Sequence, residues 1–215
     1  MIAVQAMPPI DVQATDLTRK RYERLSTYYD RLEGLTERRY RPWRIKLWGQ
    51  VYGPRVLEVG VGTGKNMPYW PVGLAITAID LTPGMLALAR RRADQLGLRP
   101  DLRLADVQAL DFPDASFDSA VATCVFCSVP DPVRGLRELT RVVRPGGQIL
   151  LLEHGRPANP LLGGLTDLLS PVVVQLIGAN LNRRTVDNAR QAGIQVMQIE
   201  ELAMAGMYKL IAAQN

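Results

Sequence analysis

The chain has 215 residues, 47% of them hydrophobic and 22% charged, and its 26 Lys or Arg against 21 Asp or Glu give a net charge of +5. This length predicts one domain with a single three-layer core that needs no disulfide or metal for support. No apolar run reaches the ~18 residues of a membrane-spanning helix, and the first residues lack the pattern of a signal peptide, so we expect a cytoplasmic protein, soluble or peripheral to a membrane.

The positive charge of the chain lies in its N-terminal quarter. Residues 1–15, with two adjacent prolines and no periodicity, predict a flexible tail. Residues 1–55 hold eleven Lys or Arg against six Asp or Glu, whereas residues 56–215 hold fifteen of each. Between residues 16 and 50, apolar and aromatic side chains recur at helical spacing among basic ones, which predicts a basic amphipathic helical lid.

A basic amphipathic lid is open to more than one interpretation. A second basic cluster at residues 38–48 includes Trp43 and Trp48, and basic helices that carry tryptophan lie on anionic membrane surfaces. The alternative is that the helices pack on the core and leave a solvated basic face. Nucleic acid is not favoured as a partner, because the basic residues are interleaved with core-type aliphatic ones and form no known module.

From residue 55 onward, segments typical of strands and helices alternate, which predicts parallel βαβ units. Helices are expected from Met67 to Trp70, from Pro83 to Leu96 with Thr82 as N-cap, and from Pro132 to Val143. Strands are expected near 55–59, 75–79, 101–105, 118–124 and 147–153, and two more, joined by a turn, at 193–199 and 207–213.

The first of these strands leads into glycines at alternate positions, Gly60, Gly62 and Gly64. Glycine lets the backbone turn sharply and approach a bound molecule, although a tight turn without a ligand is an alternative. A dinucleotide-binding turn needs its third glycine where this chain has Lys65. Asp80 ends the next strand, where a carboxylate can accept hydrogen bonds from both hydroxyls of a ribose. The pattern therefore favours an adenosine without a pyrophosphate over a nicotinamide dinucleotide.

Five motifs in this order resemble those of class I S-adenosylmethionine-dependent methyltransferases. They run from Glu58 to Gly64, from Asp80 to Leu86, from Leu104 to Val107, from Phe117 to Asp118 and from Arg144 to Gly147. The resemblance implies S-adenosylmethionine as cofactor. It also implies an α/β, Rossmann-like, doubly wound fold with a mostly parallel seven-stranded sheet, an antiparallel last strand and an N-terminal helical lid.

The resemblance also implies which residues hold the cofactor. Amides of the glycine turn, opening a helix, would bind the methionine carboxylate, Asp80 would hold the ribose, and Asp106 would accept from the adenine amino group. Taken alone, Asp106 is equally compatible with a solvated loop carboxylate or a helix cap. The expected cofactor-binding residues are Tyr29, Glu58, Gly60, Val61, Gly62, Asn66, Asp80, Leu81, Met85, Asp106, Val107 and Thr123.

Other segments resemble the bacterial phosphatidylethanolamine N-methyltransferases and the related quinone-biosynthesis and lipophilic-thiol methyltransferases. They are Tyr28-Tyr29-Asp30, Cys124 to Pro132, Glu153 to Arg156, Asn159 to Gly163 and Leu181 to Thr185. The resemblance implies that Tyr29 lies over the cofactor. One departure is at residues 179 and 180, where relatives often carry Cys-His and this chain has Ala179-Asn180.

His154 is the only histidine in the chain and follows the predicted fifth strand, at the edge of the sheet where ligands bind. An unperturbed imidazole could take a proton from an ammonium or a thiol, so we predict His154 and Tyr29 as catalytic residues. The alternative is a histidine that is hydrogen-bonded by Glu153 or backbone and only shapes the pocket. Methyl transfer needs little acid–base chemistry, because holding the acceptor in line supplies most of the rate.

The remaining features concern the acceptor. Cys124 and Cys127 are two residues apart, but their place at the end of a buried strand favours neither a redox nor a metal site. Residues 157–192 are apolar and predict an insertion over the acceptor pocket. We therefore expect N-methylation of phosphatidylethanolamine by a peripheral protein on the inner face of an anionic membrane. C-methylation of a prenylated quinone, S-methylation of a lipophilic thiol and a non-catalytic cofactor-binding protein remain alternatives, and the oligomeric state is left open.

Overall fold

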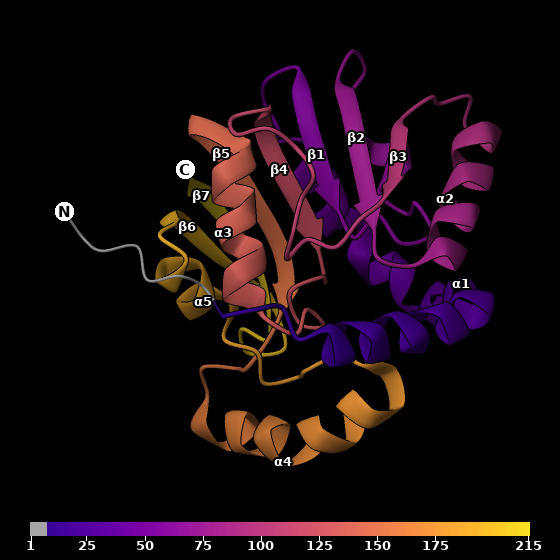
Figure 1. Ribbon diagram of the computed structural model, residues 1–215. Coiled ribbons are helices and arrows are strands. Elements are labelled where there is room, and N and C mark those ends of the chain that lie inside the picture. The colour runs from indigo at the N-terminus through magenta and orange to yellow at the C-terminus, as the bar shows by residue number, and fades with distance from the viewer. Residues whose placement is uncertain (1–7) are drawn as a thin grey trace.

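The computed structural model describes residues 8–215, except the side chains of residues 30–33, 35, 36 and 177. Its sheet has seven strands in the order β3-β2-β1-β4-β5-β7-β6 (Figure 1). The first five are parallel, and β7 is antiparallel to both of its neighbours. This confirms the predicted mostly parallel sheet with its antiparallel last strand. The strands are β1 (Arg55–Val59), β2 (Ala75–Asp80), β3 (Asp101–Leu104), β4 (Phe117–Thr123), β5 (Val143–His154), β6 (Gln195–Ala203) and β7 (Tyr208–Gln214).

Helices cover both faces of the sheet and its carboxyl edge. They are α1 (Val12–Trp48), the one-turn 3₁₀ helix η1 (Met67–Tyr69), α2 (Pro83–Gln95), α3 (Pro132–Val142), α4 (Pro160–Ile177) and α5 (Thr185–Gln191). In Figure 1, α1 runs past the carboxyl ends of the strands and α4 lies beneath it. This is the expected N-terminal lid, formed by one continuous helix.

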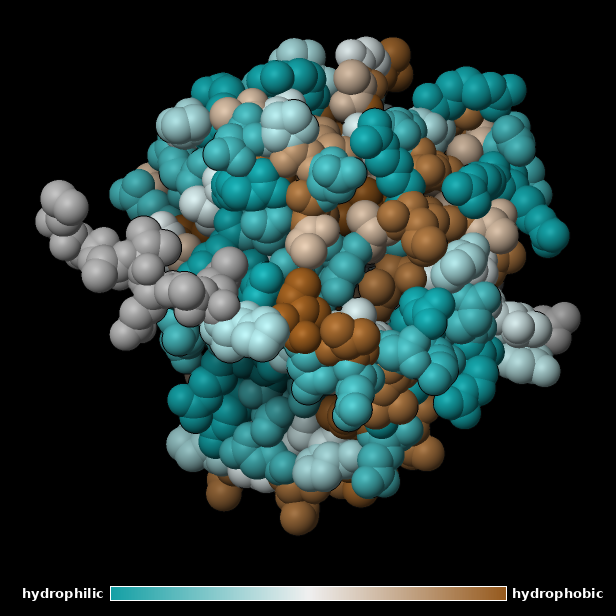
Figure 2. Space-filling model, viewed as in Figure 1, coloured by the Kyte–Doolittle hydropathy of each residue, from teal (hydrophilic) through white to brown (hydrophobic). Residues whose placement is uncertain are grey.

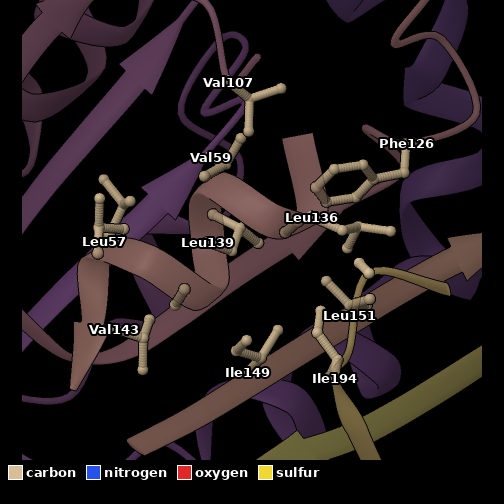
Figure 3. Close-up of a cluster of buried hydrophobic side chains, with 14 of the residues drawn as sticks. Leu57, Val59, Val107, Phe126, Leu136, Leu139, Val143, Ile149, Leu151 and Ile194 are labelled. Atoms are coloured by element: carbon tan, nitrogen blue, oxygen red, sulfur yellow. The ribbon is translucent and has the colours of Figure 1, made fainter. Parts of the chain in front are cut away.

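The core forms on both faces of the sheet because the central strands are buried on each side. Leu57 and Val59 of β1 join one cluster, which includes residues of α3 and α5 (Figure 3). Val56, which precedes Leu57 and faces the other side of the sheet, joins the other cluster with Trp48 of α1 and Leu86 of α2. The period of two along β1 therefore fixes which side chains face each layer.

Several predicted boundaries differ from the structure by one to four residues. Residues 1–7 of the predicted tail lie outside the described residues, but α1 begins at Val12, where the side chain of Asp11 accepts from the amide of Ala14. The helix predicted to Val143 ends one residue earlier, because Val143 pairs with Phe117 and opens β5. Between Phe117 and Ser119 the register of β4 with β5 shifts, and regular pairing resumes at Ser119 with Gln148. The predicted start of this strand, near residue 147, therefore falls just after the irregularity.

The predicted insertion at residues 157–192 contains two helices with different roles. α5 belongs to the sheet-covering layer, since its Ala189 is fully buried in the core. Only α4 lies outside that layer. The side chain of Asn159 accepts from two amides at its start, and Gly178, with a φ of 81°, ends it. In the part of the chain described, no helix has the length and apolarity needed to cross a bilayer.

Candidate functional site

A hollow with an empty volume of about 750 Å³ opens at the carboxyl ends of β1, β2 and β4, beneath α1. Of the residues predicted from the sequence, those that line the hollow are Tyr29, Gly60, Gly62, Asp80, Leu81, Met85, Asp106, Val107 and Thr123. The topology therefore brings together residues that are as far as 94 positions apart in the chain, at the edge where open α/β sheets bind ligands.

The turn after β1 requires glycine for two reasons. Gly60 has a φ of 65°, and a Cβ there would lie 2.4 Å from Cγ2 of Val125. Val61 does not line the hollow; it is 5% exposed and its amide donates to the carbonyl of Ile79. The helix expected to open at this turn is only η1, a single 3₁₀ turn. The turn therefore has no long helix behind it, and its amides at Val61, Gly62 and Gly64 donate to Ile79, Asp80 and Val61.

Asp80 is fixed by three hydrogen bonds. Its Oδ2 accepts from the amide of Gly62 at 2.9 Å, and its Oδ1 accepts from the amide and the hydroxyl of Thr82 at 2.9 and 2.6 Å. Thr82 thus stands at the predicted N-cap of α2 but gives its hydroxyl to Asp80 instead of capping the helix. Burial raises the pKa of Asp80, against the effect of these bonds. A carboxylate has about four acceptor positions, so about one remains, on Oδ2, for a ligand hydroxyl.

Asp106 is held by a residue that the sequence did not single out. Gln108 donates its amide and its side-chain Nε2 to the Asp106 carboxylate, at 2.9 and 3.0 Å. The Gln108 side chain also accepts from the amide of Asp131 and donates to the hydroxyl of Thr15 in α1, both at 3.0 Å. Gln108 is 2% exposed. It therefore ties the carboxylate of Asp106 to the helix that covers the hollow.

The apolar wall of the hollow is formed by Leu81, Met85 and Val107, as expected for a site that holds a flat ring. Cys124 also lines it, with a φ of 54° that is uncommon outside glycine. Burial raises the pKa of both Cys124 and Cys127, that of Cys127 to about 12. Both thiols are therefore protonated at neutral pH, and that of Cys124 adds a small apolar group to the wall.

Helix α1 covers one side of the hollow. Thr18, Tyr22 and Tyr29 line it, and the Tyr22 hydroxyl forms a 2.5 Å hydrogen bond with the hydroxyl of Ser128. The Lys65 ammonium lies 5.7 Å from the centre of the Tyr29 ring. The structure thus places Tyr29 in the wall, as expected, and adds Tyr22. No motif marks Tyr22, because its partner is 106 residues away in the chain.

Glu58 and Asn66 lie behind the wall in a buried polar network. Glu58 accepts from the Asn66 side chain and from Nε1 of Trp70, both at 2.7 Å. The Asn66 side chain also donates to the hydroxyl of Thr123 and accepts from Arg44. Burial raises the pKa of Glu58 to about 7. Of the predicted cofactor residues in this network, only Thr123 lines the hollow, so Glu58 and Asn66 position the wall and do not form it.

Comparison with known proteins agrees with this geometry. Residues 57–151 match a family described as a methyltransferase domain. A ubiquinone/menaquinone biosynthesis C-methyltransferase, UbiE, from Bdellovibrio bacteriovorus is 32% identical over 170 residues, which cover 76% of this chain and 72% of the relative. The chain belongs to the class I S-adenosylmethionine-dependent methyltransferases.

Other relatives of the methyltransferase differ in their acceptors. A phosphatidylethanolamine N-methyltransferase from Cereibacter sphaeroides is 45% identical over 112 residues, which cover 51% of this chain and 55% of the relative. A demethylmenaquinone methyltransferase from Renibacterium salmoninarum is 34% identical over 149 residues, 68% of this chain and 59% of the relative. The matches thus span little more than half of these two relatives. A Thermotoga maritima S-adenosylmethionine-dependent methyltransferase has the same fold, with a TM-score of 0.70 at 23% identity, over 91% of this chain and 98% of that chain.

S-adenosylmethionine fits the hollow of this methyltransferase. The glycine turn leaves a cradle that a Cβ at Gly60 would fill, and Asp80 keeps an acceptor position for a ribose hydroxyl. The bound cofactor supplies a methyl group on a positively charged sulfur. The protein's own contribution would be to orient the two partners and to exclude water. Helix α1, tied to the segment after β4 by the Tyr22–Ser128 contact, covers the hollow where this would occur.

His154 lies away from this hollow. It ends β5 as predicted but lines a second hollow, and its ring packs edge-on against Tyr208 at 6.0 Å. Among the described residues, nothing bonds to its Nδ1, and Glu153, the partner that the alternative interpretation required, accepts from the amides of Val125 and Phe126. Burial lowers the pKa of His154 to about 4. The imidazole is therefore neutral and a weak base, and its position does not support the predicted catalytic role.

The departure at Ala179-Asn180 has a structural explanation. Asn180 donates its backbone amide and its side chain to the carbonyl of Cys127, at 3.0 and 2.9 Å. Ala179 is buried at 7% exposure. In this methyltransferase the position therefore holds the segment after β4, which lines the cofactor hollow, and carries no base.

Proposed function

We propose that the protein transfers methyl groups from S-adenosylmethionine to the amine of phosphatidylethanolamine at a membrane surface. The observation that carries this proposal is the 45% identity to a relative named phosphatidylethanolamine N-methyltransferase. This identity is higher than the 34% and 32% found for the two quinone methyltransferases described above. Because that match covers 51% of this chain, the surface of the molecule has to supply further support.

Helix α4 supplies such support, because it presents apolar side chains to solvent. Leu161, Leu168 and Leu176 are 85%, 74% and 73% exposed. In Figure 2 hydrophobic residues project from the lower edge of the molecule, where Figure 1 places α4. Its sequence holds one charged residue, Asp167. A helix with this exposed face is suited to the boundary between lipid headgroups and acyl chains.

Basic residues border α4 and favour an anionic lipid surface. Arg21 of α1 packs at the end of α4, where a Cβ on Gly178 would lie 3.3 Å from its Cδ. At the other end, Arg156 pairs with Asp167 of α4 at 3.1 Å. Cations next to the headgroups of an anionic leaflet contribute ~1 kcal/mol each. The arrangement supports a lipophilic acceptor that reaches the hollow from a membrane.

The test is transfer of labelled methyl from S-adenosylmethionine to phosphatidylglycerol vesicles with and without phosphatidylethanolamine, followed by separation of the lipids. We expect label in methylated phosphatidylethanolamine. The matched inactive control is Asp80→Asn, which removes an expected ribose contact. Cofactor binding by the wild-type protein without any label in this lipid would contradict the proposal.

A membrane-binding assay examines the surface independently of chemistry. We expect the double variant Leu168→Ser and Leu176→Ser to lower sedimentation with phosphatidylglycerol vesicles at least fivefold. The matched control is Val72→Ser, which removes a fully exposed apolar side chain in the loop before β2. Equal sedimentation of the double variant and the control would exclude α4 as the membrane contact.

A second candidate is C-methylation of a prenylated quinone. The observation that favours it is coverage, since the quinone methyltransferase from Bdellovibrio bacteriovorus matches 76% of this chain. The same assay with a demethylated menaquinone in the vesicles separates the two candidates. Label in the quinone alone would assign the protein to this second activity.

A further inference from the structure

A second hollow, with an empty volume of about 730 Å³, lies at the end of β5. Residues of α5, β6 and β7 complete its wall. In Figure 2 hydrophilic residues gather around a recess between the positions of α5 and α4. The hollow is separate from the cofactor site, and the segment after β4 lies between them: Cys124, Val125 and Val129 line the cofactor hollow, whereas Glu153 and Arg183 hold this segment from the other side.

Several residues that line this second hollow carry a buried polar atom that bonds to none of the described residues. Among the described residues, six buried side-chain nitrogen or oxygen atoms lack a hydrogen-bond partner, and four belong to residues that line it. These atoms are Oε2 of Glu153, Nδ1 of His154, Nε of Arg183 and Oγ1 of Thr185. Glu153 and Thr185 are only 2% and 6% exposed. Because an unpaired buried polar atom is costly, four of them in one wall indicate a polar ligand.

The charges of the wall favour an anion. Five basic side chains line the hollow against three acidic ones; the basic ones are Arg156, Arg183, Arg184, Arg190 and Lys209. Arg183 is fixed in place, since its Nη2 donates to the carbonyls of Cys127 and Val129 and leaves Nε free to donate. The Thr185 hydroxyl and a neutral His154 protonated on Nδ1 can donate as well. Burial raises the pKa of Glu153 to about 7, so its carboxyl also holds a proton part of the time.

We propose that this hollow binds a phosphate-bearing anion, through Arg183, Arg184 and Thr185. Arg183, Arg184 and Thr185 place several donors in one wall, and such donors match the oxygens of a phosphate. Its neighbourhood points to a lipid headgroup as the source, because Arg156 lines the hollow and pairs with Asp167 of the apolar helix α4. The lipid source rests on the proposed function, whereas binding of the phosphate group does not.

The experiment is titration calorimetry with two soluble probes, glycerophosphoethanolamine and inorganic phosphate, on the full chain. Arg184→Gln changes an exposed side chain and Thr185→Val is nearly isosteric, so folding of both can be checked by thermal melting. The matched control is Arg99→Gln, which removes an arginine of equal charge from an exposed pair with Asp94. We expect each of the two site variants to weaken probe binding about tenfold or more and the control to leave it unchanged.

The two probes distinguish the sources of the phosphate. Tighter binding of glycerophosphoethanolamine supports the headgroup, and tighter binding of inorganic phosphate supports the site with free phosphate as its ligand. Absence of binding by both, or equal binding by the site variants and the control, would overturn the inference. Because calorimetry needs no methyl transfer, phosphate binding without methylation of phosphatidylethanolamine would refute the proposed function alone.

Discussion

Replacement of Asp80 by asparagine tests the geometry of the cofactor hollow most directly. The variant keeps an oxygen that can face Thr82, but it places an amide NH₂ where Oδ2 accepts from Gly62. The amide N–H of Gly62 and the new side-chain NH₂ are both donors, so they no longer form a hydrogen bond with each other. The charge-assisted bond to a ribose hydroxyl, worth ~1.5–3 kcal/mol, is lost, and the Gly62 amide loses its acceptor. Together these losses come to about 3 kcal/mol, which weakens cofactor affinity by ~10²-fold.

The assay is titration calorimetry of S-adenosylmethionine, with Asp94→Asn as the matched control because that carboxylate is 75% exposed on α2. Burial raises the pKa of Asp80, so the charge itself is unfavourable in the folded state and its neutral replacement should not unfold the protein. Thermal melting checks this expectation. A loss of affinity below about threefold, in a folded variant, would refute the assignment of Asp80 to the cofactor.

Three further predictions follow from the buried groups. Tyr22→Phe removes the hydrogen bond that closes α1 and should weaken cofactor binding about fivefold, ~1 kcal/mol, whereas Tyr28→Phe, at an exposed position, should not; equal effects would exclude this closure. The carboxyl of Glu58 has its pKa raised to about 7 from 4.5, so the folded state holds its proton more tightly and stability falls by ~3 kcal/mol as pH rises from 4.5 to 7. Denaturant unfolding across this range should show a flatter pH dependence for Glu58→Gln, and an unchanged slope would contradict the shift. His154→Ala should leave cofactor affinity within twofold and turnover at saturating acceptor unchanged, because the ring lies outside the cofactor hollow; a large loss of turnover would restore it as a base.

The sequence predicted the parts of the site that depend on a strand and the turn after it. The aliphatic run before the glycines predicted β1, which is buried from Val56 to Val59, and the glycines at 60 and 62 have the positive φ that only a sharp turn requires. Asp80 and Asp106 follow their strands, so the parallel topology alone brings them to one edge. Glu58 and Val61 belong to the glycine motif and Asn66 follows it, but none of the three lines the hollow. Motif membership thus did not separate residues that contact a ligand from those that support the wall.

Local residue patterns determined the elements, the parallel sheet and the place of the cofactor, because strand periodicity and turn chemistry act over a few residues. Only the tertiary structure showed that Tyr22 meets Ser128, that α4 stands apart with its leucines exposed, and that His154 lines a different hollow. Each of these depends on how segments far apart in the chain pack against each other. Packing of this kind depends on how whole surfaces are buried against each other, so the spacing of residues along the chain does not predict it.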